Sequence, residues 1–204
     1  MKILKIVVIS LLLIAGIYLL VGAFMNPVIH VESQISIQKS PEMVFEQINN
    51  LQNWKHWSYW DNIDPNMKSS FSGPEAGEGA VHSWESKNDS VGNGSMAIVK
   101  SVPGQLVETK LTFEGMGDHM GGWKIEPEGE GVKVTAWIDM NTGILFRPLM
   151  AIMGMKKVLE EDFGRSLSGL KSHCESLPEP EPEPESMENS LGSNDSIPAT
   201  VKGN

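Results

Sequence analysis

Five histidines are the side chains in this sequence best suited to proton transfer near neutral pH. They are His30, His56, His82, His119 and His173, and no two of them have a spacing common among metal ligands. The single cysteine excludes an internal disulfide framework and a cysteine-based zinc cluster. We therefore expect no metal site and no cofactor. A partly buried histidine without a catalytic role is a commoner case than a general base.

Carboxylates on the expected strands form no recognisable acid–base pair. Glu108 and Glu114 share strand parity with Lys110, which indicates a solvated face. The sequence has no Gly-x-Ser-x-Gly motif, and the glycine-rich loop 73–79 lacks the ending of a phosphate-binding loop. We interpret that loop as a flexible segment at a pocket mouth. Cys174 falls on an apolar helix stripe and is expected to be a packed thiol. No catalytic residue is assigned.

Aromatic and methionine side chains offer apolar surface for a ligand. Trp54, Trp57, Tyr59 and Trp60 could bind one, although plugging one end of a sheet is the favoured interpretation. A second group gathers near the last loops and the start of the final helix: Met116, Met120, Met140, Met150, Met153 and Met155. Such adaptable side chains suit either a pocket for varied apolar ligands or an irregular core, and both interpretations remain open.

The first element is an uncharged run from Ile6 to Met25. Its 20 residues would span about 30 Å as a helix, which matches the hydrocarbon core of a bilayer. Lys2 and Lys5 precede the run, and the next basic residue is Lys39. The positive-inside rule then places the N-terminus in the cytoplasm. We expect a single-pass protein of the cell membrane, with a transmembrane anchor over residues 1–26 and an extracytoplasmic domain.

A cleaved signal peptide is the alternative for this segment. Val21, Gly22 and Ala23 have a spacing that permits cleavage. The apolar run is longer than a usual signal-peptide core, however, and no polar region separates it from that position. An uncleaved anchor is therefore favoured.

The body alternates short helices, strands and turns. A strand is expected over 28–37, a short helix over 41–49 and a helical turn with one aromatic face over 54–60. Further strands are expected over 68–72, 80–86, 93–102, 105–114, 119–126 and 132–140, as an antiparallel meander. One long helix is expected over 147–177, with an apolar stripe that runs from Ile152 to Leu177. Gly154, Gly164 and Gly169 each weaken this helix by about 1 kcal/mol.

The C-terminal segment carries about half of the net charge of −10. Its Pro-Glu repeat begins at Pro178 and predicts an extended polyproline II conformation, followed by a polar disordered stretch to residue 204. The acidic balance argues against a nucleic-acid partner, because such proteins need clustered lysine and arginine.

The body resembles the START-like, or SRPBCC, superfamily, which includes polyketide cyclase/dehydrase-type and lipid-transfer proteins. The matching stretches include Ser-Pro-Glu-Met-Val-Phe (40–45), Asn-Trp-Lys-His-Trp-Ser-Tyr-Trp (53–60), Asp-Pro-Asn-Met (64–67), 71–79, Trp-Glu-Ser (84–86), Val-Gly-Asn-Gly (91–94), Trp-Lys-Ile-Glu (123–126) and 132–137. The resemblance covers about residues 28–177. It implies an α+β helix-grip domain over 27–177, a curved antiparallel β-sheet wrapped on a long C-terminal α-helix.

This resemblance also implies a cavity between sheet and helix that holds a hydrophobic small molecule or lipid. His82 shares strand parity with Trp84, and His119 with Trp123. The candidate cavity residues are His82, Trp84, Met96, Phe113, His119, Trp123, Met140, Met150, Met153 and Leu159. The fold hosts many activities. A cyclase or hydratase using a cavity histidine or carboxylate, and a protein-interaction module without a small ligand, therefore remain alternatives.

Overall fold

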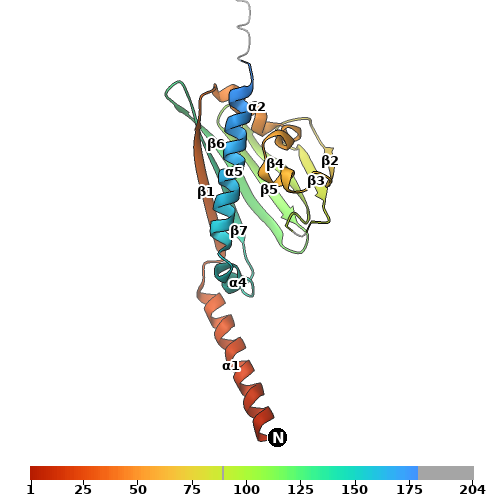
Figure 1. Cartoon of the computed structure of the whole chain (residues 1–204), viewed down its shortest axis with the longest axis vertical. Helices are drawn as coiled ribbons and strands as arrows, with labels where there is room; N and C mark the ends of the chain where they lie inside the picture. The colour runs from red at the N-terminus through yellow and green to blue at the C-terminus, as the bar shows by residue number, and fades with distance from the viewer. Residues whose placement is uncertain (89, 179–204) are drawn as a thin grey trace, which may run out of the picture.

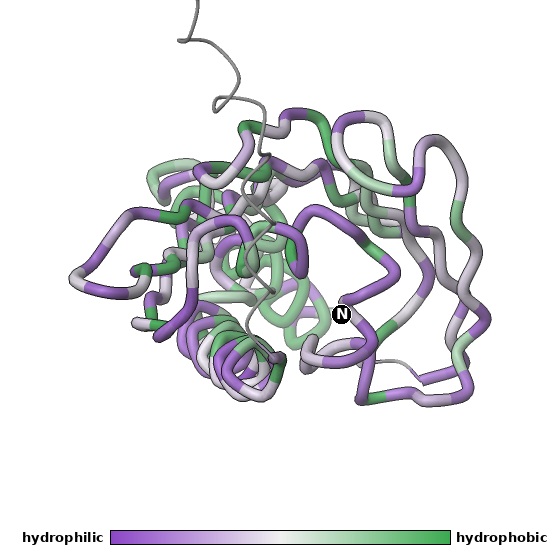
Figure 2. Tube along the Cα trace, turned by 90° about the horizontal axis from the view of Figure 1, so that it is seen from above, coloured by the Kyte–Doolittle hydropathy of each residue, from purple (hydrophilic) through white to green (hydrophobic). Residues whose placement is uncertain are grey.

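The apolar N-terminal run forms a single helix, α1 (Lys2–Phe24), which projects away from the rest of the molecule (Figure 1). The structure is a computed structural model that describes residues 1–88 and 90–178; the predicted acidic tail from residue 179 lies outside this range. Seen along the long axis, purple hydrophilic segments predominate in the outer loops, and green hydrophobic segments lie more often toward the middle (Figure 2). Within the described residues, α1 alone is long and apolar enough to cross a membrane.

Seven antiparallel strands form one sheet in the order β1-β7-β6-β5-β4-β3-β2. The strands are β1 (Val28–Ile37), β2 (Lys68–Ser72), β3 (Val81–Glu85), β4 (Asn93–Val102), β5 (Leu106–Phe113), β6 (Gly117–Glu128) and β7 (Gly131–Asn141). The predicted meander is confirmed. Strands β2 to β7 each pair with the next along the chain, and β1 closes the order beside β7.

The hairpin between β6 and β7 is tighter than the sequence predicted. The strands expected over 119–126 and 132–140 leave 127–131 as a loop, and this expectation is wrong. Glu128 already pairs with Gly131, so only two residues turn the chain. Gly129 supplies the positive φ of 62° that such a turn needs. Pro127 is tolerated inside β6 because β5 begins only at Leu106, opposite Lys124, and leaves this stretch of β6 without a partner on that side.

Three short helices follow β1: α2 (Pro41–Asn49), the 3₁₀ helix η1 (Leu51–His56) and α3 (Tyr59–Ile63). The Ser40 hydroxyl caps α2 by accepting from the Met43 backbone N–H at 3.3 Å. The side chains of Trp54 and Trp57 lie with ring centroids 4.8 Å apart, and both also contact Trp123. These three tryptophans are buried and form part of the core.

The C-terminal helix is interrupted, so the expected single helix over 147–177 is wrong. It divides into α4 (Arg147–Ile152) and α5 (Met155–Ser176) at Gly154, which has a left-handed φ of 65°. Ile152, expected on the packed stripe, is 80% exposed. The predicted apolar stripe is confirmed in α5, which buries Phe163, Leu167 and other apolar side chains.

One face of the sheet is covered by helices from two parts of the chain. Helix α5 contacts β1 and, less extensively, β7 (Figure 1). Helix α2 contacts β5 and β6, and η1 contacts β3. The helix-grip arrangement of the α+β class is thereby confirmed, with the core between the sheet and these helices.

Candidate functional site

Five rings on the covered face of the sheet form a continuous row across four strands. The ring centroids of Phe71 and His82 lie 4.7 Å apart, and those of His82 and Trp84 lie 5.5 Å apart. Phe113 follows at 5.8 Å from Trp84, and His119 at 5.9 Å from Phe113. We call these five residues the aromatic row. Strands β2, β3, β5 and β6 supply it, so no short stretch of sequence contains the site.

Strand register explains how the row crosses β4. Trp84 pairs with Gly94, which in turn pairs with Phe113. A Cβ atom on Gly94 would lie 2.7 Å from the Trp84 ring. The missing side chain therefore lets the Trp84 indole lie over β4 and reach Phe113.

Three polar atoms in the row are buried without a hydrogen-bond partner among the described residues. They are Nε1 of Trp84 and both ring nitrogens of His119. Trp54 and Trp57 in the core differ, since the indole of Trp54 donates to the Ile48 carbonyl at 2.9 Å and that of Trp57 to the Gln47 carbonyl at 3.2 Å. Buried polar groups normally have partners, and an unmade bond costs about 1–3 kcal/mol. These atoms thus lack, within the described residues, the hydrogen-bond partners that buried polar groups normally have.

Burial sets the charge of the two histidines in the row. It lowers the pKa of His119, a shift that the nearby Asp118 carboxylate opposes. It also lowers the pKa of His82, against the opposing effect of Asp61. Both rings are therefore neutral at pH 7. A neutral imidazole has one donor and one acceptor: His82 uses one ring nitrogen with the Ser69 hydroxyl at 3.0 Å, whereas His119 has both available.

The structure brings together half of the residues expected to line a cavity. His82, Trp84, Phe113 and His119 belong to the aromatic row, and Met96 pairs with His82 across β3 and β4. Met140 is buried at the end of β7, next to Asp139, which pairs with Met120 near the start of β6.

The other expected residues lie elsewhere. Trp123 is buried with Trp54 and Trp57, and Leu159 packs against the same core from α5. Met150 lines a separate pocket beside α4, and Met153 is largely exposed. The methionines therefore do not assemble into one site.

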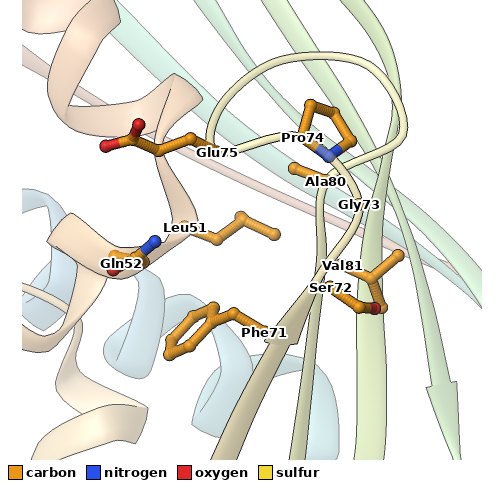
Figure 3. Close-up of a pocket in the computed structure, with 9 residues that line it drawn as sticks. All are labelled: Leu51, Gln52, Phe71, Ser72, Gly73, Pro74, Glu75, Ala80 and Val81. Atoms are coloured by element: carbon orange, nitrogen blue, oxygen red, sulfur yellow. The ribbon is translucent and has the colours of Figure 1, made fainter.

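A pocket of about 310 Å³ lies at the Phe71 end of the aromatic row. Figure 3 shows Leu51 from η1 and Phe71 from β2 projecting into the space between these elements. The pocket is lined by Leu51, Gln52, Phe71, Ser72, Gly73, Pro74, Glu75, Ala80 and Val81. The glycine-rich loop expected at a pocket mouth does border this pocket.

A second pocket, of about 600 Å³, lies between the start of β1, α4 and the first turn of α5. Its wall includes Ile29, Met150 and Met155, with Arg147 and Lys156 among its charged residues. No cluster of three or more histidine, cysteine or acidic side chains able to hold a metal ion occurs in the described part of the chain.

Two members of the site were missed at the level of sequence, and one left a signal. Gly94 interrupts an otherwise regular strand pattern, which often marks a close approach by another group. Phe71 gave no comparable signal, because its neighbours in the row come from a different strand. Its role depends on the pairing of β2 with β3.

Comparison with known proteins agrees with this architecture. The family described as "Polyketide cyclase / dehydrase and lipid transport" matches residues 28–175. No curated protein sequence matches the chain significantly.

Similar solved structures share the fold at low sequence identity. The Aha1 dimer from Colwellia psychrerythraea is 16% identical, with a TM-score of 0.53 over 72% of this chain and 97% of that chain. A protein from Thermus thermophilus is 17% identical, with a TM-score of 0.54 over 72% and 97%. A Staphylococcus aureus protein of unknown function is 13% identical, with a TM-score of 0.52 over 74% and 98%.

Proposed function

The chain belongs to the polyketide cyclase/dehydrase and lipid transport family, and from that premise we propose that it is a membrane-tethered binding protein for a hydrophobic small molecule or lipid. The ligand lies against the aromatic row, where ring faces and Met96 supply apolar contact. Apolar burial provides most of the affinity of such sites, and a few polar groups orient the ligand.

The observation that carries this proposal is the set of buried polar atoms without partners in the aromatic row. Trp84 Nε1 has one hydrogen bond to donate, and a neutral His119 ring has one to donate and one to accept. An apolar ligand with a hydroxyl or carbonyl group would satisfy these atoms and remove the free-energy cost of burying them alone. A purely structural row would be expected to pair its polar atoms, as Trp54 and Trp57 do.

The membrane tether is supported by contacts between α1 and the body. The Tyr18 hydroxyl donates to the Leu145 carbonyl at 2.6 Å, and Arg147 donates to the Gly22 carbonyl at 3.0 Å. Cleavage after Ala23 would remove both contacts, which favours an uncleaved anchor. Lys2 and Lys5 favour a cytoplasmic N-terminus and hence an extracytoplasmic body.

Native mass spectrometry of the full chain, purified from membranes in detergent, tests ligand binding. We expect the wild-type protein to carry a hydrophobic adduct, and His119→Leu to retain about tenfold less, because a lost buried hydrogen bond costs about 1–1.5 kcal/mol. His56→Leu is the matched control, since His56 is exposed and outside the row. A wild-type protein without adduct, whose melting temperature no added lipid changes, would contradict the proposal.

The orientation can be tested by fusing a reporter enzyme after residue 177. A reporter that folds only outside the cytoplasm should be active in this fusion. Activity of a cytoplasm-specific reporter at the same position would reverse the proposed topology.

A further inference from the structure

Apolar side chains are exposed together around α4. This helix lies at the end of the body nearest α1 (Figure 1). We call this surface the α4 patch. Its members, each at least 40% exposed, are Ile144, Leu145, Phe146, Leu149, Ile152 and Met153. Exposed apolar groups on one short segment are unusual for a surface in water and mark an interaction site.

The α4 patch is joined directly to α1. Tyr18 and Arg147 make the two hydrogen bonds between these elements described above. A Cβ atom on Gly22 would lie 2.4 Å from the Ile144 carbonyl oxygen, so the helix and the loop before α4 are in close contact. The apolar residues of α1 and the α4 patch therefore adjoin each other.

These contacts set the depth of the patch relative to a membrane crossed by α1. Tyr18 precedes Met25, at the end of the apolar run, by seven residues, or about 10 Å along a helix. Leu145 is bonded to Tyr18 and so lies below the level at which the chain leaves the bilayer. Segments that lie in the interface typically bury their apolar side about 5–10 Å deep.

Basic residues lie within and after the patch: Arg147 falls inside segment 144–153 and donates to the Gly22 carbonyl at 3.0 Å, and Lys156 and Lys157 follow in α5. Arg147, Lys156 and Lys157 all line the second pocket. Lys156 Nζ lies 3.8 Å from Glu160 Oε1, and Lys157 Nζ lies 3.9 Å from Glu161 Oε1. Such exposed ion pairs contribute little and exchange readily for other anions. An apolar patch bordered by cations is complementary to an anionic lipid surface.

We propose that residues 144–153 insert into the outer leaflet beside α1, so that the protein contacts its membrane through the helix and through the α4 patch. This inference rests on the proposed membrane tether but not on ligand binding. The second pocket then opens at the membrane surface, where lipids have access to it.

Depth-dependent fluorescence quenching of the full chain tests this proposal. Single cysteines replace Ile152 in the patch, Leu13 in α1, or Glu130 in the β6–β7 turn at the opposite end of β7, and each is labelled with an environment-sensitive dye. Cys174 is buried and, because burial raises its thiol pKa to about 11, stays unlabelled. The proteins are reconstituted in phosphatidylcholine/phosphatidylglycerol vesicles that contain nitroxide-labelled lipids.

We expect the nitroxide lipids to quench the labels at Leu13→Cys and Ile152→Cys at least about threefold more than the label at Glu130→Cys. If Leu13→Cys is quenched but Ile152→Cys behaves like Glu130→Cys, the anchor stands and the patch proposal fails. A patch covered by a second copy or another protein would give this same failing result. If no label is quenched, the tether and the patch proposal both fail, whereas ligand binding is judged separately by mass spectrometry.

Discussion

His119 is a polar ring kept neutral by burial, and its replacement should stabilise the empty protein. His119→Leu removes two buried polar atoms that have no partner among the described residues. We expect the free energy of unfolding to rise by about 1 kcal/mol at pH 7 while ligand retention falls. Thermal unfolding of delipidated protein measures the first effect. A large loss of stability would indicate that the ring is a structural element.

The pH dependence of stability provides a second test of His119. Its folded-state pKa is lowered, so the unfolded chain binds a proton more readily than the folded protein. Stability should therefore fall as the pH drops below the unfolded value of about 6.5. The free energy of unfolding of His119→Leu should fall less steeply than that of wild type between pH 7.5 and 5.5. Part of the pH dependence should remain, because burial also lowers the pKa of His82. Parallel curves for the two proteins would contradict this assignment.

Cys174 should be nearly inert in the folded protein. It is fully buried among the core residues, and desolvation raises its thiol pKa to about 11. Because the thiolate is the reactive form, iodoacetamide should modify native protein at pH 8 far more slowly than protein unfolded in guanidinium. Equal rates, measured by mass spectrometry, would show that the core opens readily at this helix.

Strand parity correctly placed His82 with Trp84, and His119 with Trp123, on the same face of the sheet, where these side chains are buried or partly buried. That they line a cavity stays a prediction. Parity gave no indication that Trp123 has ring neighbours in the core whereas Trp84 has an unpartnered Nε1. That distinction depends on Gly94 and on strands distant in sequence.

Helix α5 contains two glycines that should respond in opposite ways to the same substitution. A Cβ on Gly164 has nothing within 4 Å, so Gly164→Ala should stabilise the protein by about 1 kcal/mol through helix propensity. A Cβ on Gly169 would lie 2.3 Å from the Trp57 carbonyl oxygen. Gly169→Ala should therefore destabilise the protein by about 1–3 kcal/mol. Thermal unfolding of the two variants compares them, and shifts of the same sign would refute this packing.

Elements with a strong local pattern were predicted well, and those that depend on one backbone angle were not. Residues 28–37 alternate and form β1 with those bounds. The apolar stripe across Gly154 resembled one continuous helix, because residue spacing does not reveal the left-handed conformation that separates α4 from α5. The β6–β7 turn was misjudged for a related reason, since Pro127 is a turn signal that an unpaired strand edge can accommodate.

The contacts between α1 and the body should fix the orientation of α1 relative to the sheet. A leucine at Gly22 would force α1 away from the Ile144 carbonyl, whereas a Cβ at Gly16 has nothing within 4 Å. Spin labels on Leu13→Cys and Glu130→Cys should give a narrow distance distribution. We expect Gly22→Leu to broaden it and the control Gly16→Leu to leave it unchanged, as measured by pulsed electron paramagnetic resonance. Distance distributions of equal width in Gly22→Leu and Gly16→Leu would show that these contacts do not fix the orientation of α1.

At the scale of the molecule, the sequence indicated an apolar helix and a helix-grip body but not their connection. Tyr18 and Leu145 lie far apart in the chain, and neither belongs to a recognisable motif. The α4 patch was likewise hidden, because Ile152 was assigned to the packed stripe of a longer helix. Contacts between distant segments, rather than local pattern, define both features.

The connection between α1 and β1 consists of only residues 25–27. Three extended residues reach at most about 11 Å. On the proposed tether, the body therefore has almost no freedom to move away from the membrane that α1 crosses. The body could not carry a ligand across an aqueous gap. It would instead stay at the membrane, where a ligand arrives by lateral diffusion in the bilayer and leaves on a separate, mobile carrier protein.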